Sequence, residues 1–293
     1  MANCIIAQSG GPTSVINSSV VGLLEANNTL GTFNKVFAGL NGIEGILNGN
    51  IIELSSFSQE EINNFRYTPS SGLGSCRYKM KKLEESTEEY DKLLEILKAN
   101  DIKAFFYVGG NDSMDTTAKL SAYAKKTGID IKFIGIPKTI DNDLMYTDHT
   151  PGFGSAAKFI ATSVLETYLD SSVYINNGIF ILETMGRDTG WLASAAALAQ
   201  LNGKQVADFI YLPETAFDID KFLIDVKNKF EEQNQVYIVV SEGIRTAEGK
   251  FVAEAHAQAH DKFGHAQLGG VGNYLKNLII SSGITSRVKS LEL

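Results

Sequence analysis

Short apolar runs alternate along this chain with segments in which apolar residues recur at helical spacing. The runs are nearly continuous in Val, Ile and Phe, which is typical of parallel strands buried on both faces. We therefore expect strands at Cys4–Ala7, Val36–Ala38, Ala104–Val108, Phe133–Ile136, Ile179–Leu182, Ala207–Leu212 and Tyr237–Val240.

The segments between these runs are predicted to be helices, because their apolar residues collect on one side. Asp112, Asp188 and Asp218 stand at expected helix starts, where a negative side chain stabilises the helix. The expected helices are Asn17–Glu25, Glu85–Lys98, Asp112–Lys125, Ser155–Leu169, Asp188–Gln200, Asp218–Phe230 and Gly269–Ile280.

Repeated strand–helix units predict an α/β fold with parallel sheets and right-handed crossovers. A polar, charge-rich stretch at Asp141–Thr150 separates two well-patterned halves, so we expect two domains, residues 1–140 and 141–293. Val288–Leu293 alternates apolar and polar residues like the start of a strand. That ending leads us to expect a chain truncated at its C-terminus.

Composition narrows the class of protein. The 293 residues are 44% hydrophobic and carry a net charge of −8, which argues against binding to nucleic acid or an anionic membrane. Two cysteines make neither a disulfide framework nor a cysteine-rich zinc site. We find no apolar stretch near the roughly 20 residues needed to span a bilayer, and no signal segment. These features predict a soluble cytoplasmic protein.

Two glycine-rich turns each join an expected strand to an expected helix. They are Ser9–Thr13, which contains Gly10 and Gly11, and Val108–Ser113, which contains Gly109 and Gly110. Glycine lets a backbone approach a ligand closely, and a helix start offers free N–H groups to an anion. Two such turns suggest a ligand across neighbouring strand ends, although each turn alone is also an ordinary tight turn. Asp112 suits either a magnesium ion or a helix cap.

The segment Pro137–Asp143, with the sequence Pro-Lys-Thr-Ile-Asp-Asn-Asp, is the most specific motif. Its polarity exceeds what a connector after a strand requires. Asp141 can accept a proton from a substrate hydroxyl that attacks phosphorus. Thr139 can bind an anion, and Lys138 can neutralise a transferring phosphoryl group. The alternative is a solvated loop with a turn stabilised by Asp141.

Three further segments carry candidate ligand-binding residues. Arg187 lies in Thr184–Gly190 and can bind a phosphate through two hydrogen bonds, or pair with Asp188 at a helix start. Glu242 follows the expected strand Tyr237–Val240 and can accept hydrogen bonds from sugar hydroxyls, or be simple loop polarity. Arg77, flanked by Gly and Ser, suits a donor phosphate or a surface loop.

Together these motifs resemble the phosphofructokinase family. The order and spacing match at Gly10-Gly11, Gly74–Arg77, Gly109–Ser113, Lys138–Asp143, Met185–Arg187 and Glu242. The resemblance implies two Rossmann-like domains, with the phosphoryl donor bound by residues 1–140 and fructose 6-phosphate by residues 141–293. It implies an enzyme of glycolysis, oligomeric as a homodimer or larger, that uses Mg²⁺ and binds neither nucleic acid nor membrane.

The resemblance also implies residue roles. Asp141 would deprotonate the sugar 1-hydroxyl, with Thr139 and Lys138 acting on the transferred group. The donor would contact Gly10, Gly11, Arg77, Gly110 and Asp112. The sugar phosphate would contact Thr139, Ile140, Asp141, Met185, Gly186, Arg187, Glu242 and Arg287. Magnesium would lie near Asp112, Asn111 and Asp143.

Asp112 and Lys138 decide which donor we expect. Members that use ATP tend to have glycine at both positions, whereas members that use pyrophosphate tend to have these side chains. An aspartate would repel the α-phosphate of ATP, and a lysine can neutralise a pyrophosphate leaving group. We therefore expect pyrophosphate. Asn111 departs from the family's usual aspartate, and Gly178 stands about where some ATP-dependent members have an arginine that reaches a neighbouring subunit.

Two alternatives stay open on the sequence. One is an ATP-dependent 6-phosphofructokinase. The other is a non-catalytic regulatory subunit that binds sugar phosphate, which Asn111 and the expected truncation favour. Retention of Asp141, Thr139, Arg187 and Lys138 argues against the second.

Overall fold

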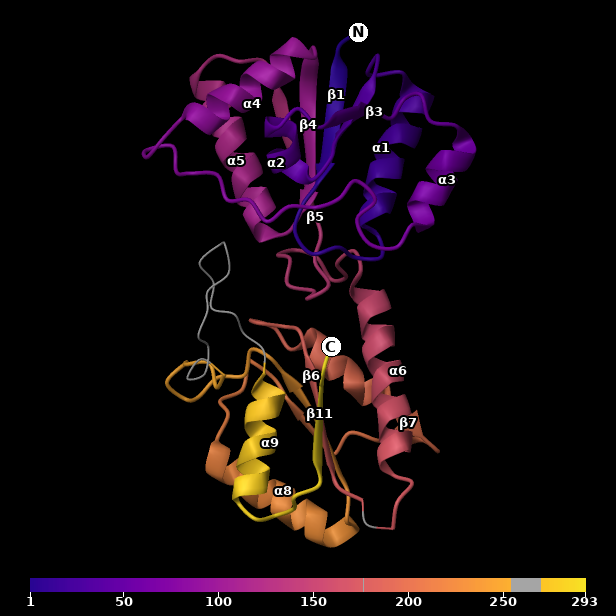
Figure 1. Cartoon of the computed structure of the whole chain (residues 1–293), viewed down its shortest axis with the longest axis vertical. Helices are drawn as coiled ribbons and strands as arrows, with labels where there is room; N and C mark the ends of the chain where they lie inside the picture. The colour runs from indigo at the N-terminus through magenta and orange to yellow at the C-terminus, as the bar shows by residue number, and fades with distance from the viewer. Residues whose placement is uncertain (176, 254–269) are drawn as a thin grey trace. The chain divides into compact units, whose positions relative to one another are not determined.

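The computed structural model describes residues 1–175, 177–253 and 270–293. The chain forms two compact units, Met1–Thr139 and Ile140–Leu293, each with its own sheet. Figure 1 shows helices on both faces of each sheet. The expected α/β class is confirmed.

The first unit contains a five-stranded sheet in the order β3-β2-β1-β4-β5. Its strands are β1 (Asn3–Gln8), β2 (Val36–Gly39), β3 (Ile51–Glu53), β4 (Ile102–Gly109) and β5 (Lys132–Pro137). All neighbours pair in parallel except β2 and β3, which are antiparallel. The parallel strands read as continuous apolar runs because helices cover both of their faces.

The helices of the first unit divide between those two faces. They are α1 (Ile16–Leu30), α2 (Gly42–Leu47), α3 (Gln59–Tyr67), α4 (Glu88–Ala99) and α5 (Asn111–Lys126). Ile5 and Phe105 pack with buried residues of α2, α4 and α5. Cys4 and Ile6 pack on the other face with α1 and α3. Successive strand residues therefore alternate between two apolar cores.

The second unit contains a four-stranded parallel sheet in the order β11-β6-β10-β9. Its strands are β6 (Ile179–Thr184), β9 (Phe209–Tyr211), β10 (Val236–Ser241) and β11 (Val288–Glu292). The short strands β7 (Gln200–Leu201) and β8 (Lys204–Gln205) form a separate hairpin. The strand expected near Val288 is thus present.

Two apolar cores also enclose this second sheet. The helical segments are α6 (Phe153–Ser171), α7 (Trp191–Ser194), the 3₁₀ turn η1 (Ala195–Leu198), α8 (Ile219–Gln233) and α9 (Val271–Ser281). Phe180 and Leu182 face α6 and η1, whereas Ile179 and Ile181 face α8 and α9. β6 and β10 occupy the centre of the sheet, so their carboxyl ends are the positions that both cores support.

One expected helix is wrong. Asp188–Gln200 is a short helix followed by a 3₁₀ turn and the first strand of a hairpin. Asp188 does not cap a helix, because its carboxylate pairs with Arg245. The Gly190 N–H donates to Glu214 Oε1 at 2.8 Å and not to the Asp188 side chain. By contrast, Asp218 caps α8 as expected, accepting a hydrogen bond from the Lys221 N–H at 2.9 Å.

Three short elements of the first unit were not expected from the sequence. α2 and β3 have only six and three residues, too few to show a periodicity. α3 buries only Ile62, so it lacks an apolar stripe. Its capping box, formed by Ser58 and Glu61, is the sequence signal that predicts it. The predicted start of the last helix, Gly269, lies outside the described residues.

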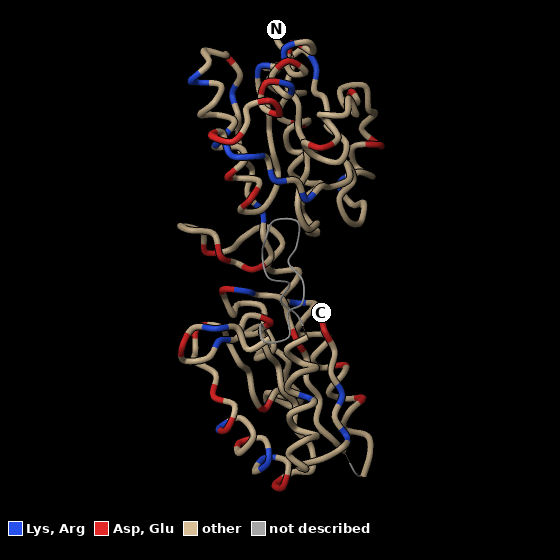
Figure 2. Tube along the Cα trace, turned by 60° about the vertical axis from the view of Figure 1, so that its left-hand side comes forward, with Lys and Arg blue, Asp and Glu red and all other residues tan. Residues whose placement is uncertain are grey.

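Charged residues of both signs are interspersed along both units, as Figure 2 shows. Several are paired on the surface, for example Lys35 with Glu53 at 2.7 Å. Within the described ranges, no helix is long and apolar enough to cross a membrane.

Candidate active site

The two glycine-rich turns of the first unit follow strands that are neighbours in the sheet. β1 and β4 pair in parallel, so Gly10 and Gly110 both lie beyond the carboxyl edge. The chain leaves β1 toward β2 on one side and β4 toward β5 on the other. Ligands of open α/β sheets bind in the crevice at such a switch point. The sheet therefore brings the two turns together, as the sequence led us to expect.

Hydrogen bonds join these turns to each other and to the loop that carries Arg77. The hydroxyls of Ser9 and Ser113 lie 2.8 Å apart. Ser75 Oγ donates to the Gly10 carbonyl at 2.5 Å, and the Gly10 N–H donates to the Cys76 carbonyl at 3.1 Å. Gly10 has a φ of 76°, a left-handed conformation that favours glycine. The three loops thus form one connected rim.

Lys138 supplies a positive charge to this rim. Its backbone N–H donates to the Gly109 carbonyl at 3.0 Å, which holds it beside β4. Its Nζ donates to the Gly11 carbonyl and lies 3.5 Å from the position that a Cβ on Gly10 would occupy. The side chain is only 7% exposed. A buried ammonium next to a glycine turn is suited to a phosphate group.

The other expected donor residues surround this rim with different exposures. Asp112 lies half-buried in the first turn of α5, whose N-cap is Gly110. Asn111 and Arg77 are exposed. Thr13, which the sequence analysis did not single out, has a buried hydroxyl without a hydrogen-bond partner in the described structure. A buried hydroxyl in the turn after Gly11 is a further group suited to an anion.

The second unit brings its two candidate loops together in the same way. β6 and β10 are parallel neighbours, so Met185–Arg187 and Glu242 follow adjacent strand ends. The Glu242 N–H donates to the Thr184 carbonyl at 2.9 Å, and the Gly186 N–H donates to Glu242 Oε1 at 3.4 Å. The Ser241 hydroxyl donates to the Gly186 carbonyl. The loops are therefore locked in one arrangement.

Close packing of these loops requires glycine at position 243. A Cβ on Gly243 would lie 2.0 Å from the Arg187 carbonyl oxygen, which no side chain permits. Arg187 is half-buried beside Glu242, and its charge acts on that carboxyl. Burial raises the pKa of Glu242, whereas the Gly186 N–H and the Arg187 charge oppose that rise. An arginine and a carboxylate at one strand edge can bind a phosphate and a hydroxyl group.

The expected base, Asp141, belongs to this second cluster. The Thr189 hydroxyl donates to the Asp141 carbonyl at 2.9 Å, and the negative charge of Asp141 raises the pKa of Glu242. Asp143 Oδ1 is buried and has no hydrogen-bond partner in the structure as described. Because a buried carboxylate oxygen needs a partner, this atom is suited to a cation or a ligand donor.

Arg287 does not join this cluster within the chain, contrary to the expected sugar-phosphate contact. It precedes β11, and its carbonyl accepts the Ile179 N–H at 3.0 Å at the amino end of β6. Met185 follows the other end of that strand, about 20 Å away at the rise of a β-strand. The Arg287 guanidinium instead lies 4.3 Å from the ring centre of Tyr174. Strand direction explains this separation, since sequence spacing does not reveal the edge.

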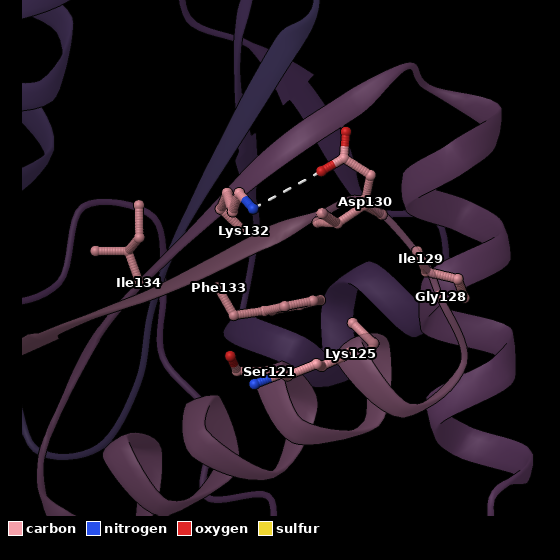
Figure 3. A pocket seen from close by; sticks show the side chains of 10 residues that line it. Ser121, Lys125, Gly128, Ile129, Asp130, Lys132, Phe133 and Ile134 are labelled. Atoms are coloured by element: carbon pink, nitrogen blue, oxygen red, sulfur yellow. Dashed lines mark ion pairs between the residues drawn. The ribbon is translucent and has the colours of Figure 1, made fainter.

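A cavity of about 600 Å³ in the first unit lies apart from these motifs (Figure 3). Its lining residues belong to the last turns of α5, the loop that follows and the start of β5. Among them, Lys132 pairs with Asp130 at 3.8 Å. Lys138 follows the opposite end of β5. None of the expected site residues lines this cavity, so its size does not identify the active site. The clustered polar groups at the carboxyl edges are the candidate site.

A protein cage for a metal is absent from the described parts of the chain. No group of three or more His, Cys, Asp or Glu residues gathers there. Magnesium does not need such a cage, because it is commonly held by one or two carboxylates, substrate phosphates and water.

Comparisons with known proteins match this chain to one family. Residues 3–289 match the sequence model of the family described as Phosphofructokinase. A pyrophosphate–fructose 6-phosphate 1-phosphotransferase of Methylococcus capsulatus is 47% identical over 280 residues, which are 94% of this chain and 66% of that protein. The chain thus spans just under two thirds of the length of the curated relatives it matches.

Solved structures show the same fold. The crystal structure of a pyrophosphate-dependent phosphofructokinase from Nitrosospira multiformis matches 99% of this chain and 68% of its own, with a TM-score of 0.82 and 38% identity. A phosphofructokinase from Saccharomyces cerevisiae matches 99% of this chain and 38% of its own, with a TM-score of 0.74. At 22% identity the second likeness concerns the fold alone.

Proposed function

This chain belongs to the phosphofructokinase family, and we propose that it transfers a phosphoryl group from pyrophosphate to fructose 6-phosphate. The products would be fructose 1,6-bisphosphate and phosphate, in a reversible step of glycolysis. The observation that carries this proposal is the buried Lys138 ammonium on the Gly11 carbonyl, at the meeting point of the glycine turns. It provides fixed positive charge without requiring a nucleoside pocket.

Each unit has one task in this proposal. The rim formed by Gly10, Gly11, Gly110 and the Arg77 loop binds the donor, and the Met185–Arg187 and Glu242 cluster binds the sugar phosphate. Residues 1–140 and 141–293 are thus the proposed donor and sugar domains. Arg287 is left out of the sugar site, because its own sheet places it at the opposite edge.

The chemistry follows from the charges of these groups. Asp141 removes the proton from the sugar 1-hydroxyl as that oxygen attacks phosphorus. The bond between the transferred phosphorus and the bridging oxygen breaks, and the leaving phosphate keeps the electron pair. Thr139 can donate a hydrogen bond to the transferred group, while Lys138 offsets the charge on the leaving group. Arg187 holds the sugar phosphate in place.

We propose Mg²⁺ as the cofactor, with Asp143, Asp112 and Asn111 as its candidate ligands. The unpartnered, buried Asp143 Oδ1 fits a cation, and Asp112 is half-buried at the start of α5. Asn111 is exposed, so its amide would contribute less. Bound Mg²⁺ would neutralise the phosphate oxygens and hold them in line.

Asp112 is also the residue that argues for pyrophosphate over ATP. It lies in the first turn of a helix whose N-terminus faces the proposed donor rim. A carboxylate there repels an additional α-phosphate, whereas pyrophosphate ends before that point. The relatives whose names specify pyrophosphate agree with this choice.

The experiment that tests this function compares initial rates of fructose 6-phosphate phosphorylation with pyrophosphate and with ATP, each with Mg²⁺. We expect turnover with pyrophosphate and little with ATP. Turnover with ATP alone would make the chain an ATP-dependent kinase. Binding of fructose 6-phosphate without turnover would instead support a regulatory subunit.

Two broader features belong to the same proposal. We expect a homodimer or larger assembly, since Phe159, Trp191 and Leu198 of the second unit are 59%, 52% and 69% exposed. Large apolar side chains at a surface are typical of subunit contacts. We also expect the cytoplasm as the location, because both proposed substrates are phosphate anions that do not cross a bilayer unaided.

A further inference from the structure

The loop that carries Asp141 is held by a residue with no role in the chemistry above. Asn142 is only 7% exposed, and its backbone has a φ of 59°. Its Oδ1 accepts the Thr150 N–H at 2.9 Å, and its Nδ2 donates to the Asp148 carbonyl at 3.2 Å. Thr150 is fully buried just before α6. The Asn142 amide therefore ties both ends of the loop together.

The left-handed backbone at Asn142 controls where its neighbours point. Asparagine adopts this conformation more readily than other residues with a Cβ. A left-handed residue reverses the chain locally, so the conformation at position 142 sets the directions of Asp141 and Asp143. The buried, unpartnered Oδ1 of Asp143 is one result of that arrangement. A residue between two acids that the proposed reaction uses thus determines their placement.

A second contact holds Asp141 from the other side. The Thr189 hydroxyl donates to the Asp141 carbonyl at 2.9 Å. Thr189 belongs to the tight turn that carries Arg187, since its own carbonyl would lie 2.5 Å from a Cβ on Gly186. The turn proposed to bind the sugar phosphate is therefore bonded to the backbone of the proposed base.

We propose that Asn142 and Thr189 are positioning residues that clamp Asp141 in the orientation needed to deprotonate the sugar hydroxyl. Neither side chain is proposed to touch the substrates. This proposal rests on the proposed function, since it gives Asn142 and Thr189 a role in the same site. Displacing a reacting group by about 1 Å can cost about a hundredfold in rate, so two hydrogen bonds at this position matter.

Conservative variants test the clamp. Thr189→Val keeps the shape but removes the hydroxyl donor. Asn142→Asp keeps the acceptor for the Thr150 N–H but replaces the Nδ2 donor. We expect each variant to lower kcat about tenfold while the KM of both substrates changes less than about twofold, because Asp141 acts on the chemical step.

Matched controls exist in the same unit. Thr162 donates its hydroxyl to the Lys158 carbonyl at 2.8 Å on α6, so Thr162→Val removes the same kind of bond. Asn234 has a φ of 56° and donates its Nδ2 to the Ile175 carbonyl at 2.7 Å, so Asn234→Asp repeats the other change. We expect both controls to retain kcat within about twofold.

The decisive comparison uses an Asp141→Asn background. If the clamp acts only through Asp141, Thr189→Val and Asn142→Asp will lower kcat no further in that background. A merely structural role would lower the activity or the folded fraction equally in both backgrounds. An unchanged kcat in both single variants, or full additivity with Asp141→Asn, would overturn the proposal.

Hydrogen exchange tests the clamp without any activity. We expect amides of residues 141–150 to exchange at least about tenfold faster in Asn142→Asp and Thr189→Val than in the two controls. If the unmodified protein has no activity with pyrophosphate or ATP, the proposed function fails, yet faster exchange still supports the clamp. Unchanged exchange would overturn the clamp whatever the activity.

Discussion

Glu183 Oε2 accepts a hydrogen bond from the Gly272 N–H at 2.8 Å, across 89 residues of sequence. Glu183 lies in the central strand β6 and is 2% exposed, while Gly272 lies in the first turn of α9. The other carboxyl oxygen is buried without a hydrogen-bond partner among the described residues. The buried Glu183 carboxyl group thus accepts a hydrogen bond from the first turn of α9, as a capping side chain would.

Burial is the main reason why the pKa of Glu183 rises from 4.5 to about 7. The nearby negative charges of Glu292 and Glu242 raise it further, whereas hydrogen bonds from the N–H groups of α9 lower it. The folded state therefore keeps its proton at a pH where the unfolded chain loses it. The contribution of Glu183 to the free energy of unfolding should be largest below pH 4.5. It should fall as the pH rises from 4.5 to 7. We expect a loss of about 2 kcal/mol over that window.

Glu183→Gln should flatten this pH dependence, because glutamine keeps an acceptor for Gly272 without ionising. The measurement is urea unfolding at several pH values, followed by fluorescence of Trp191, the chain's one tryptophan, which reports on the second unit. Glu84→Gln, at an exposed position, is the control. An equal pH slope in the protein and in Glu183→Gln would contradict the assignment.

Asp141→Asn should lower kcat for phosphoryl transfer about a hundredfold or more, because it removes the proposed base and keeps the shape of the side chain. Steady-state rates with pyrophosphate and fructose 6-phosphate measure this loss. Asp148→Asn, in the exposed part of the same loop, should stay within about twofold. Near-normal transfer by Asp141→Asn would show that another group accepts the proton.

Asp112→Gly should raise the use of ATP relative to pyrophosphate by about tenfold, because it removes the charge that repels the α-phosphate. The ratio of kcat/KM for the two donors measures the change. Asp115→Gly, one turn further along α5, removes a charge of the same helix as a control. If Asp112→Gly leaves the ratio unchanged, this carboxylate does not select the donor.

Lys138→Met should lower kcat with pyrophosphate about a hundredfold, because it keeps an apolar stem but removes the charge and the bond to Gly11. Methionine is a better replacement than glycine, because glycine would also remove the packing that the apolar stem of Lys138 provides under the loop. Rates with a matched Lys125→Met variant, at the far end of α5, provide the reference. Equal rates in the two variants would exclude a role for Lys138 in the chemistry.

Gly243→Ala should raise the KM for fructose 6-phosphate about tenfold, because its Cβ would displace the backbone of Arg187. The KM for pyrophosphate should change little, since the donor rim belongs to the other unit. Gly22→Ala is the control, because a Cβ at Gly22 meets nothing within 4 Å. An unchanged sugar KM would mean that Arg187 does not bind the sugar.

Local patterns predicted much of this protein. Apolar runs located the parallel strands, including β1 and β10, because strands covered on both faces need apolar residues at every position. The polar motifs were therefore placed correctly at strand ends, since parallel strands bring their carboxyl ends to one edge. The helix expected at Asp188–Gln200 failed because Asp188 and Gly190 found partners far along the chain.

Contacts between distant residues were decided only by the tertiary structure. Sequence alone determined that Lys138, Arg187 and Arg287 are basic residues near strands. Strand order and direction then decided that Lys138 lies under Gly11 and that Arg287 lies at the edge opposite Met185. The reason is physical: a periodicity reports which side of an element is buried, whereas a partner 89 or 127 residues away depends on which elements pack together.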